Sequence, residues 1–201
     1  GTVVEPDGRI SINNPKAIAG LKMAAGWVGT IAPRGVLNYE EEDARGVFQN
    51  GKALFMRNWP YAYAPSQKAD SPIKGKVGVA PLPKAAGEAK GGAALGGWSL
   101  SVVKYSKNPA IAADLALYMA SAAVQKDRAI NGGFNPTRPE VYKDKDVIAA
   151  NPFVASLEDV FVNATPRPAT ATGLKYPEVS QAFWAATHEV LSGKAKAADA
   201  A

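Results

Sequence analysis

Three Asn-Pro pairs are the features of this 201-residue sequence that most constrain its fold, because each predicts where a helix begins. The pairs are Asn14-Pro15, Asn108-Pro109 and Asn151-Pro152. An Asn side chain accepts hydrogen bonds from the free amides of a first helical turn, and Pro at the first helical position loses no hydrogen bond. We therefore expect a helix to start at each of these three points.

Apolar residues recur at helical spacing behind each pair and in two further segments. The first helix is expected over residues 15–28, another over 40–49 ahead of Asn50-Gly51, and the last from Pro177 to a glycine cap at Gly193. The patterns predict amphipathic helices that pack their apolar side on a core. The apolar side consists of Ile111, Leu115, Tyr118 and Met119 in the helix after Pro109, of Phe153, Leu157, Val160 and Phe161 in the helix after Pro152, and of Val179, Phe183, Val190 and Leu191 in the last helix.

Short β-type runs alternate with the predicted helices. They cover residues 53–56, 77–80 and 98–103, each rich in apolar side chains and bordered by Gly or Pro. Strands that alternate with helices predict an α/β layered architecture. The stretch 81–97 is rich in Pro, Gly, Ala and Lys, and it is the best candidate for a crossing between two lobes.

Composition excludes several classes of protein. The sequence has no cysteine, which excludes disulfides, thiolate nucleophiles and Cys-ligated zinc. Its net charge of +5 comes from evenly spread basic residues without a basic run, so we expect no nucleic-acid partner. No apolar stretch approaches the roughly 18 to 20 residues that cross a bilayer. The segment 1–8 contains neither an initiator Met nor a targeting signal, and we expect the chain to be cut from a longer one.

The sequence offers little catalytic chemistry. His188 is the single histidine, lies in the predicted last helix, and is interpreted as a structural or surface residue. The glycine clusters do not match the spacing of a dinucleotide or phosphate loop. The acidic run 40–43 begins a predicted helix, where it complements the helix dipole. We therefore predict no catalytic residue, no metal site and no cofactor.

Two aromatic segments stand out because they lie in predicted loops next to strands. One is 57–63, which contains Trp59, and the other is 96–99, which contains Trp98. A Trp ring offers a flat apolar face and an N–H donor, which suits the C–H-rich face and the hydroxyl edge of a pyranose ring. Glycine before Trp98 lets a ligand approach the backbone closely. Ordinary core packing of the two rings remains the alternative at this point.

A series of short motifs follows in a fixed order along nearly the whole chain. The motifs are the residues 48–61 (FQNGKALFMRNWPY), 78–83 (GVAPLP), 96–102 (GGWSLSV), Asn108-Pro109, 136–138 (PTR), Arg167-Pro168 and 176–180 (YPEVS). In order and spacing they resemble the family 1 extracellular solute-binding proteins of ABC importers, especially the branch that binds trehalose, maltose and related α-glucosides.

The resemblance implies a type II periplasmic-binding-protein-like α/β fold with two lobes and about twice this length. It implies that the chain is the C-terminal half, made mainly of the C-terminal lobe. Residues 1–85 would form the first part of that lobe, 92–133 a segment of the N-terminal lobe, and 134–201 the return to the C-terminal lobe. The missing lobe would supply the other half of the binding site.

The resemblance also assigns a sugar site to named residues. Trp59 and Trp98 are similar to sugar-stacking aromatics, and Gly97 to a backbone contact beside them. Arg167 resembles an arginine whose planar fork hydrogen-bonds sugar hydroxyls. The other two assigned aromatics, for which core packing stays open, are Tyr61 and, by similarity to more distant maltose-binding relatives, Trp184.

The function implied is that of a receptor for an ABC importer, periplasmic or extracellular, with a lipoprotein anchor as one form of attachment. Its partners would be a sugar, expected to be an α-linked disaccharide, and the membrane permease subunits of the importer. Self-association through exposed lobe surface is also expected. The alternatives are a carbohydrate-active enzyme, a binding protein for a non-sugar solute, and a protein-interaction module whose exposed aromatics act as hot spots.

Overall fold

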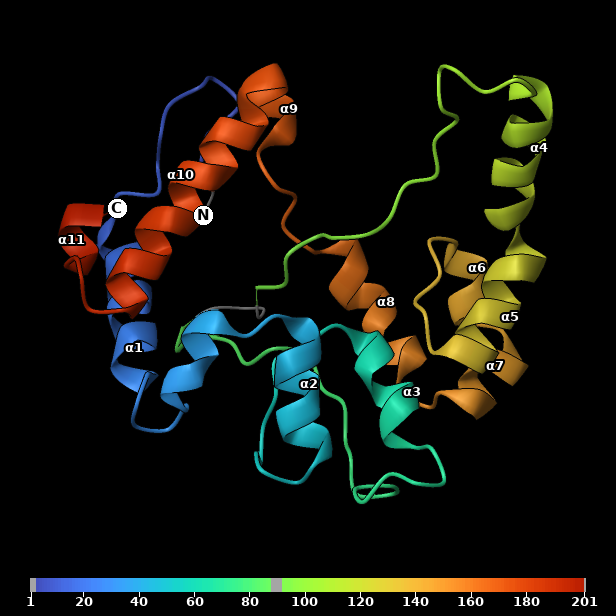
Figure 1. The fold of residues 1–201 in the computed structure, drawn as a ribbon, viewed down its shortest axis with the longest axis horizontal. Coiled ribbons are helices and arrows are strands. Elements are labelled where there is room, and N and C mark those ends of the chain that lie inside the picture. Colours follow the sequence, from blue (N-terminus) through green and yellow to red (C-terminus); the bar gives the residue numbers. More distant parts are fainter. Residues whose placement is uncertain (1–2, 88–91, 201) are drawn as a thin grey trace. The chain divides into compact units, whose positions relative to one another are not determined.

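The computed structural model describes residues 3–87 and 92–200, and the chain divides into two compact units (Figure 1). One unit joins Gly1–Glu42 to Pro166–Ala201, and we call it the terminal unit. The other is Asp43–Thr165, which we call the central unit. Each unit is described separately below.

The terminal unit is built from helices of both chain ends. Helix α1 packs on α10 and α11, and α10 also packs on α11, on α9 and on the short 3-10 helix η3. Val190 and Ala197 are its buried apolar residues. The helices are α1 (Pro15–Trp27), η1 (Arg34–Asn38), α9 (Ala169–Thr172), η3 (Gly173–Lys175), α10 (Tyr176–Leu191) and α11 (Ala197–Ala200).

The central unit contains the larger core. Helices α5, α6, α7 and α8 pack on one another, while α4 contacts α5 (Figure 1). Its core cluster consists of Ala129, Val141, Tyr142, Val147, Val154 and Leu157. The helices are α2 (Glu41–Gln49, whose first two residues belong to the terminal unit), η2 (Pro60–Ala62), α3 (Tyr63–Ser66), α4 (Pro109–Met119), α5 (Ala122–Gly132), α6 (Pro139–Tyr142), α7 (Lys145–Ala150) and α8 (Val154–Val162).

Helix α8 confirms the apolar pattern predicted for it. Leu157 is 3% exposed, and the other three predicted residues, Phe153, Val160 and Phe161, pack against the core cluster. Phe153 also meets Tyr63 edge-on, with ring centroids 4.7 Å apart. Burial of such side chains is the main source of folding free energy, so the stability of the central unit depends on these contacts.

The three Asn-Pro pairs have three different outcomes. Asn14 caps α1 as predicted, because its Oδ1 accepts from the Ala17 amide at 3.0 Å. Asn108 precedes α4, but its side chain makes no capping bond. The prediction for Asn151 is wrong, because α8 begins only at Val154. Asn151 is buried instead, and its Nδ2 donates to the Ala129 carbonyl at 2.8 Å, where it links the end of α7 to α5.

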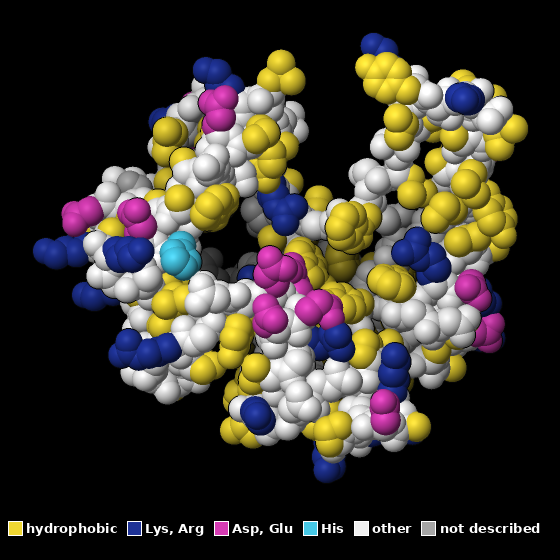
Figure 2. Space-filling model, in the orientation of Figure 1, with side chains coloured by type: hydrophobic (Ala, Val, Ile, Leu, Met, Phe, Trp, Pro, Cys, Tyr) yellow, Lys and Arg dark blue, Asp and Glu magenta, His cyan; other side chains and the backbone are white. Residues whose placement is uncertain are grey.

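The core packing predicted for α4 is wrong within the described residues. Ile111, Leu115 and Tyr118 are all exposed, and so is Leu117 on another side of the helix, whereas Met119, the fourth predicted residue, is half-buried. Hydrophobic side chains are accordingly visible on the surface over α4 in Figure 2. Phe183 of α10, which was also expected to be buried, is exposed too. The periodicity correctly predicts both helices, but burial also needs a facing partner.

No helix of the described chain is long and apolar enough to cross a bilayer.

The three predicted strands also need correction. Residues 53–56, 77–80 and 98–103 are not assigned to strands, and the described chain shows only isolated bridges, such as the parallel bridge between Ala94 and Thr165. A strand is stable only when its amide and carbonyl groups pair with a neighbouring strand. No described segment pairs in this way with the three runs, and apolar side chains such as Phe55 are exposed.

Candidate ligand-binding site

The backbone at Trp59 is held on both sides. Trp59 is extended and precedes η2, whose first residue is Pro60. Its amide donates to Oδ1 of Asn58 at 2.7 Å, and its carbonyl accepts from the Ala62 amide at 3.1 Å. Pro fixes its own backbone angle and disfavours a helical conformation in the residue before it. The direction of the Trp59 Cα–Cβ bond is therefore set by a stiff turn.

A packed platform supports this turn. Ala62 is buried in η2 and Ser66 in α3. The side-chain Nε2 of Gln49 in α2 donates to the Pro65 carbonyl at 3.2 Å. Gly133 ends α5 in the left-handed conformation, and a Cβ at this position would lie 2.8 Å from Cβ of Ala64. The α5 terminus and α3 can approach this closely only because position 133 is glycine.

The indole of Trp59 lies against the second aromatic segment. A Cβ placed on Gly96 would be 2.5 Å from Cη2, 3.0 Å from Cζ3 and 3.3 Å from Cζ2 of Trp59. By contrast, the space beside Gly97 is open, with nothing within 4 Å of its Cβ position. The structure therefore brings Trp59 and the Gly96 backbone together, although the two segments are far apart in the sequence.

The second segment is itself anchored. The Leu95 amide donates to the Thr165 carbonyl at 2.8 Å, and the Thr165 amide donates to the Ala93 carbonyl at 2.7 Å. These two bonds form the bridge between Ala94 and Thr165. Trp98 follows and is 100% exposed. Its ring is available to a ligand and does not form part of a core within the central unit.

The remaining predicted site residues are placed as follows. Tyr61 lies in η2, on the same turn as Trp59, and is half-buried. Arg167 is exposed and belongs to the terminal unit, as does Trp184, which is exposed on α10. The central unit thus contains Trp59, Tyr61, Gly97 and Trp98. Gly96 is the contact that the sequence interpretation did not single out, and the Gly-Gly pair before Trp98 is the signal that could have indicated it.

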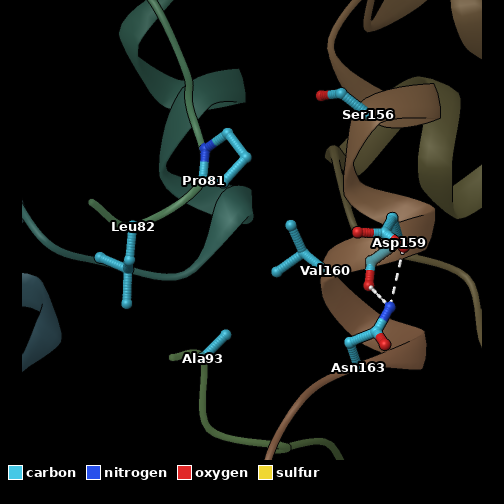
Figure 3. A pocket seen from close by; sticks show the side chains of 7 residues that line it. All are labelled: Pro81, Leu82, Ala93, Ser156, Asp159, Val160 and Asn163. Atoms are coloured by element: carbon cyan, nitrogen blue, oxygen red, sulfur yellow. Dashed lines mark hydrogen bonds between the residues drawn. The ribbon is translucent and has the colours of Figure 1, made fainter. Parts of the chain in front are cut away.

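A hollow of about 200 Å³ lies elsewhere in the central unit (Figure 3). It is bordered by Pro81 and Leu82 on one side and by α8 on the other, with Asp159 and Asn163 at its polar end. The side-chain Nδ2 of Asn163 donates to Oδ1 and to the carbonyl of Asp159, both at 2.8 Å. No predicted site residue lines this hollow, and we do not assign the ligand to it.

Titratable groups with a shifted pKa also lie outside the aromatic site. Hydrogen bonds to Asp146 and Asp144 raise the pKa of Lys126, and the bond from Lys126 lowers the pKa of Asp144. Burial raises the pKa of Tyr142 in the core. Among residues 3–87 and 92–200, no group of three His, Asp or Glu side chains is close enough together to hold a metal ion. The candidate site therefore consists of aromatic faces and open backbone.

A family model provides the first comparison with known proteins. The model described as bacterial extracellular solute-binding protein matches residues 4–155. A "probable ABC transporter-binding protein" of Deinococcus radiodurans is 55% identical over 194 residues, which cover 96% of this chain and 46% of the relative. The chain thus spans about half the length of the relatives that it matches.

Solved structures agree with this comparison. Maltose-bound MalE3 of T. maritima superposes on the whole chain with a TM-score of 0.92 and 43% identity, over 51% of its own length. An ABC transporter solute-binding protein of Agrobacterium radiobacter in complex with ribitol superposes with a TM-score of 0.82 at 23% identity, over 50% of its length. These superpositions confirm the predicted periplasmic-binding-protein-like fold class, although the expected strands do not form ladders among the described residues.

Proposed function

Because this chain belongs to the family of bacterial extracellular solute-binding proteins, we propose that it is part of a sugar receptor for an ABC importer. The observation that carries the proposal is the pairing of Trp59 with the segment that leads to the fully exposed Trp98, with open backbone at Gly97 between them. The family consists of binding proteins, so the chain is not an enzyme, as its sequence predicts.

The geometry suits a sugar in particular. Trp59, whose backbone is held by its turn, and the exposed Trp98 would offer apolar faces to the C–H groups of a pyranose ring. The open side of Gly97 lets a ring or hydroxyl approach the main chain. The superposition on maltose-bound MalE3 at 43% identity supports the same class of ligand. We propose an α-linked disaccharide such as maltose or trehalose.

Arg167, Trp184 and Tyr61 are further proposed sugar contacts. In this proposal the exposed guanidinium of Arg167 hydrogen-bonds sugar hydroxyls in its planar fork geometry. Trp184 would add a further stacking face from α10, where it is exposed, and Tyr61 would border the site from the Trp59 turn. These three roles rest on the family resemblance together with exposure or loop position.

The lobe assignment is also a proposal. The chain would represent the C-terminal half of the receptor, with residues 1–85 and 134–201 in one lobe and 92–133 in the other. The exposed apolar side chains of α4 and of Leu100, Val102 and Val103 support it, because they would be covered by the other lobe in the full-length protein. The support is limited to residues 100–119. Helix α5, which belongs to the same predicted segment, packs Ala129 against core residues from 134–201 and does not support it.

Location and partners follow from the same family. The receptor would act outside the cytoplasmic membrane, in the periplasm or at the cell surface, with a lipid anchor as one form of attachment. Its protein partners would be the permease subunits of the importer. The exposed apolar surface of α4 would allow self-association in a chain that lacks the other lobe.

The test is a titration of the full-length protein with maltose, trehalose and sucrose, followed by intrinsic Trp fluorescence. We expect a saturable fluorescence change with at least one sugar. This change should be lost in Trp59→Ala, while the melting temperature of the variant stays the same as that of the wild type. Failure of all three sugars to change the fluorescence or to shift the melting temperature would contradict the proposal and favour a non-sugar solute.

A further inference from the structure

We infer that Gly96 is the positioning residue that seats the Trp59 indole, and this inference rests on the proposed function. The two residues belong to different segments of the central unit. The three ring atoms nearest to the Cβ position of Gly96, namely Cη2, Cζ3 and Cζ2, lie on the outer edge of the benzene ring of the indole. The contact is thus between a ring edge and a main-chain surface that lacks a side chain.

The need for glycine at position 96 comes from this contact alone. Gly96 does not adopt the left-handed conformation, so an alanine there meets no backbone strain. A methyl group would nevertheless lie 2.5 Å from Cη2, well inside van der Waals contact. The neighbouring backbone is tied to Thr165 by two hydrogen bonds, and the Trp59 backbone is tied by its own turn. The ring is therefore the part that must move.

A moved ring changes the binding surface without unfolding the protein. Trp59 is half-buried, and its ring lies at the end of a side chain that can rotate out of the contact. Gly97, next in the chain, has open space and is the residue that would face the ligand. The Gly-Gly pair thus divides two tasks, in which Gly96 seats one stacking ring and Gly97 leaves room for the sugar.

The experiment is a double-mutant cycle in the full-length protein with Gly96→Ala and Trp59→Phe. A phenyl ring lacks the three atoms that meet Gly96, so Trp59→Phe removes the clash. We expect Gly96→Ala to weaken maltose binding by about tenfold when Trp59 is present and to have little further effect when position 59 is Phe. Gly78→Ala is the matched control, because Gly78 is exposed and a methyl group there has nothing within 4 Å.

A second readout does not depend on sugar. The contribution of Trp59 to the near-ultraviolet circular dichroism is the difference between the spectra with Trp and with Phe at position 59. Without ligand, this difference spectrum should change when Gly96→Ala is present and stay the same when Gly78→Ala is present. An unchanged spectrum, or an effect of Gly96→Ala that is equal in both backgrounds, would overturn the role of Gly96. A variant that fails to fold even with Trp59→Phe would overturn it as well. If the wild type binds no sugar while the spectrum changes as expected, the proposed function fails and the seating of Trp59 stands.

Discussion

Helices α4 and α8 have similar apolar patterns in the sequence and opposite environments in the structure. Leu157 of α8 is 3% exposed within the core of the central unit, whereas Leu115 of α4 is 56% exposed. Both helices follow an Asn-Pro pair and both have apolar residues at helical spacing. The comparison teaches that an amphipathic pattern predicts a helix and the side that will be buried, while the partner that buries it has to be present.

The largest expected difference is between truncations at these two leucines. Leu157→Ala should lower the free energy of unfolding by about 2–5 kcal/mol, because it leaves a cavity in a packed core. Leu115→Ala should change it by less than about 0.5 kcal/mol in this chain, because the side chain has little contact to lose. Urea denaturation of the two variants measures both values. Equal losses would mean that α4 is packed as well as α8.

The Asn-Pro pairs sharpen the comparison at the helix starts. Asn151→Ala should lower the free energy of unfolding by about 1–3 kcal/mol, since it removes the buried side chain that donates to the Ala129 carbonyl. Asn14→Ala should cost about 1 kcal/mol through the lost cap of α1. Asn108→Ala, whose side chain makes no capping bond, should stay within about 0.5 kcal/mol.

Thermal denaturation of the three variants, followed by far-ultraviolet circular dichroism, gives this order directly. A loss at Asn108 as large as that at Asn151 would show that α4 has a stabilising contact at its start that the structure does not contain.

The smallest effect concerns the ion pairs between α5 and the start of α7. Lys126 Nζ lies 2.9 Å from Oδ2 of Asp144 and 2.6 Å from Oδ2 of Asp146, and the hydrogen bond from Lys126 lowers the pKa of Asp144. A carboxyl group whose pKa is lowered by folding stabilises the fold at pH values above its ordinary pKa, which is 3.8 for Asp. This stabilisation is lost as the pH falls through the lowered pKa.

Asp144→Asn tests this effect, because Asn keeps the cap of α7 but has no charge. The wild type should have a slightly higher urea midpoint than the variant at about pH 6, and the gap should close towards about pH 2. A gap that stays constant with pH would exclude the charge as its cause.

The sequence predicted the positions of α1, α2, α4 and α10 well, since helical periodicity is a local property. Asn14 caps α1, and the four residues proposed for α8 lie in or against the core. The prediction of a strand at 98–103 was wrong because a strand needs a paired neighbour, which no described segment provides. The predicted burial of α4 was wrong because its apolar residues likewise have no facing partner among the described residues.

The sugar site is still a prediction. The exposure of Trp98 and the open space at Gly97 agree with the roles that the family resemblance implies, while the roles themselves remain proposals. The contact between Trp59 and Gly96 could not be read from either segment alone, because it joins two loops that are distant in the sequence. Such a contact depends on how the chain folds between them.

Isothermal titration of maltose into the full-length protein tests the central claim most directly, namely that the exposed Trp98 binds a sugar. Trp98→Ala should weaken binding by about tenfold or more, as expected for an aromatic anchor. Trp27→Ala, which removes another exposed tryptophan from α1, should leave the affinity within about twofold. Equal affinity of wild type and Trp98→Ala, or an equal loss in both variants, would contradict the account.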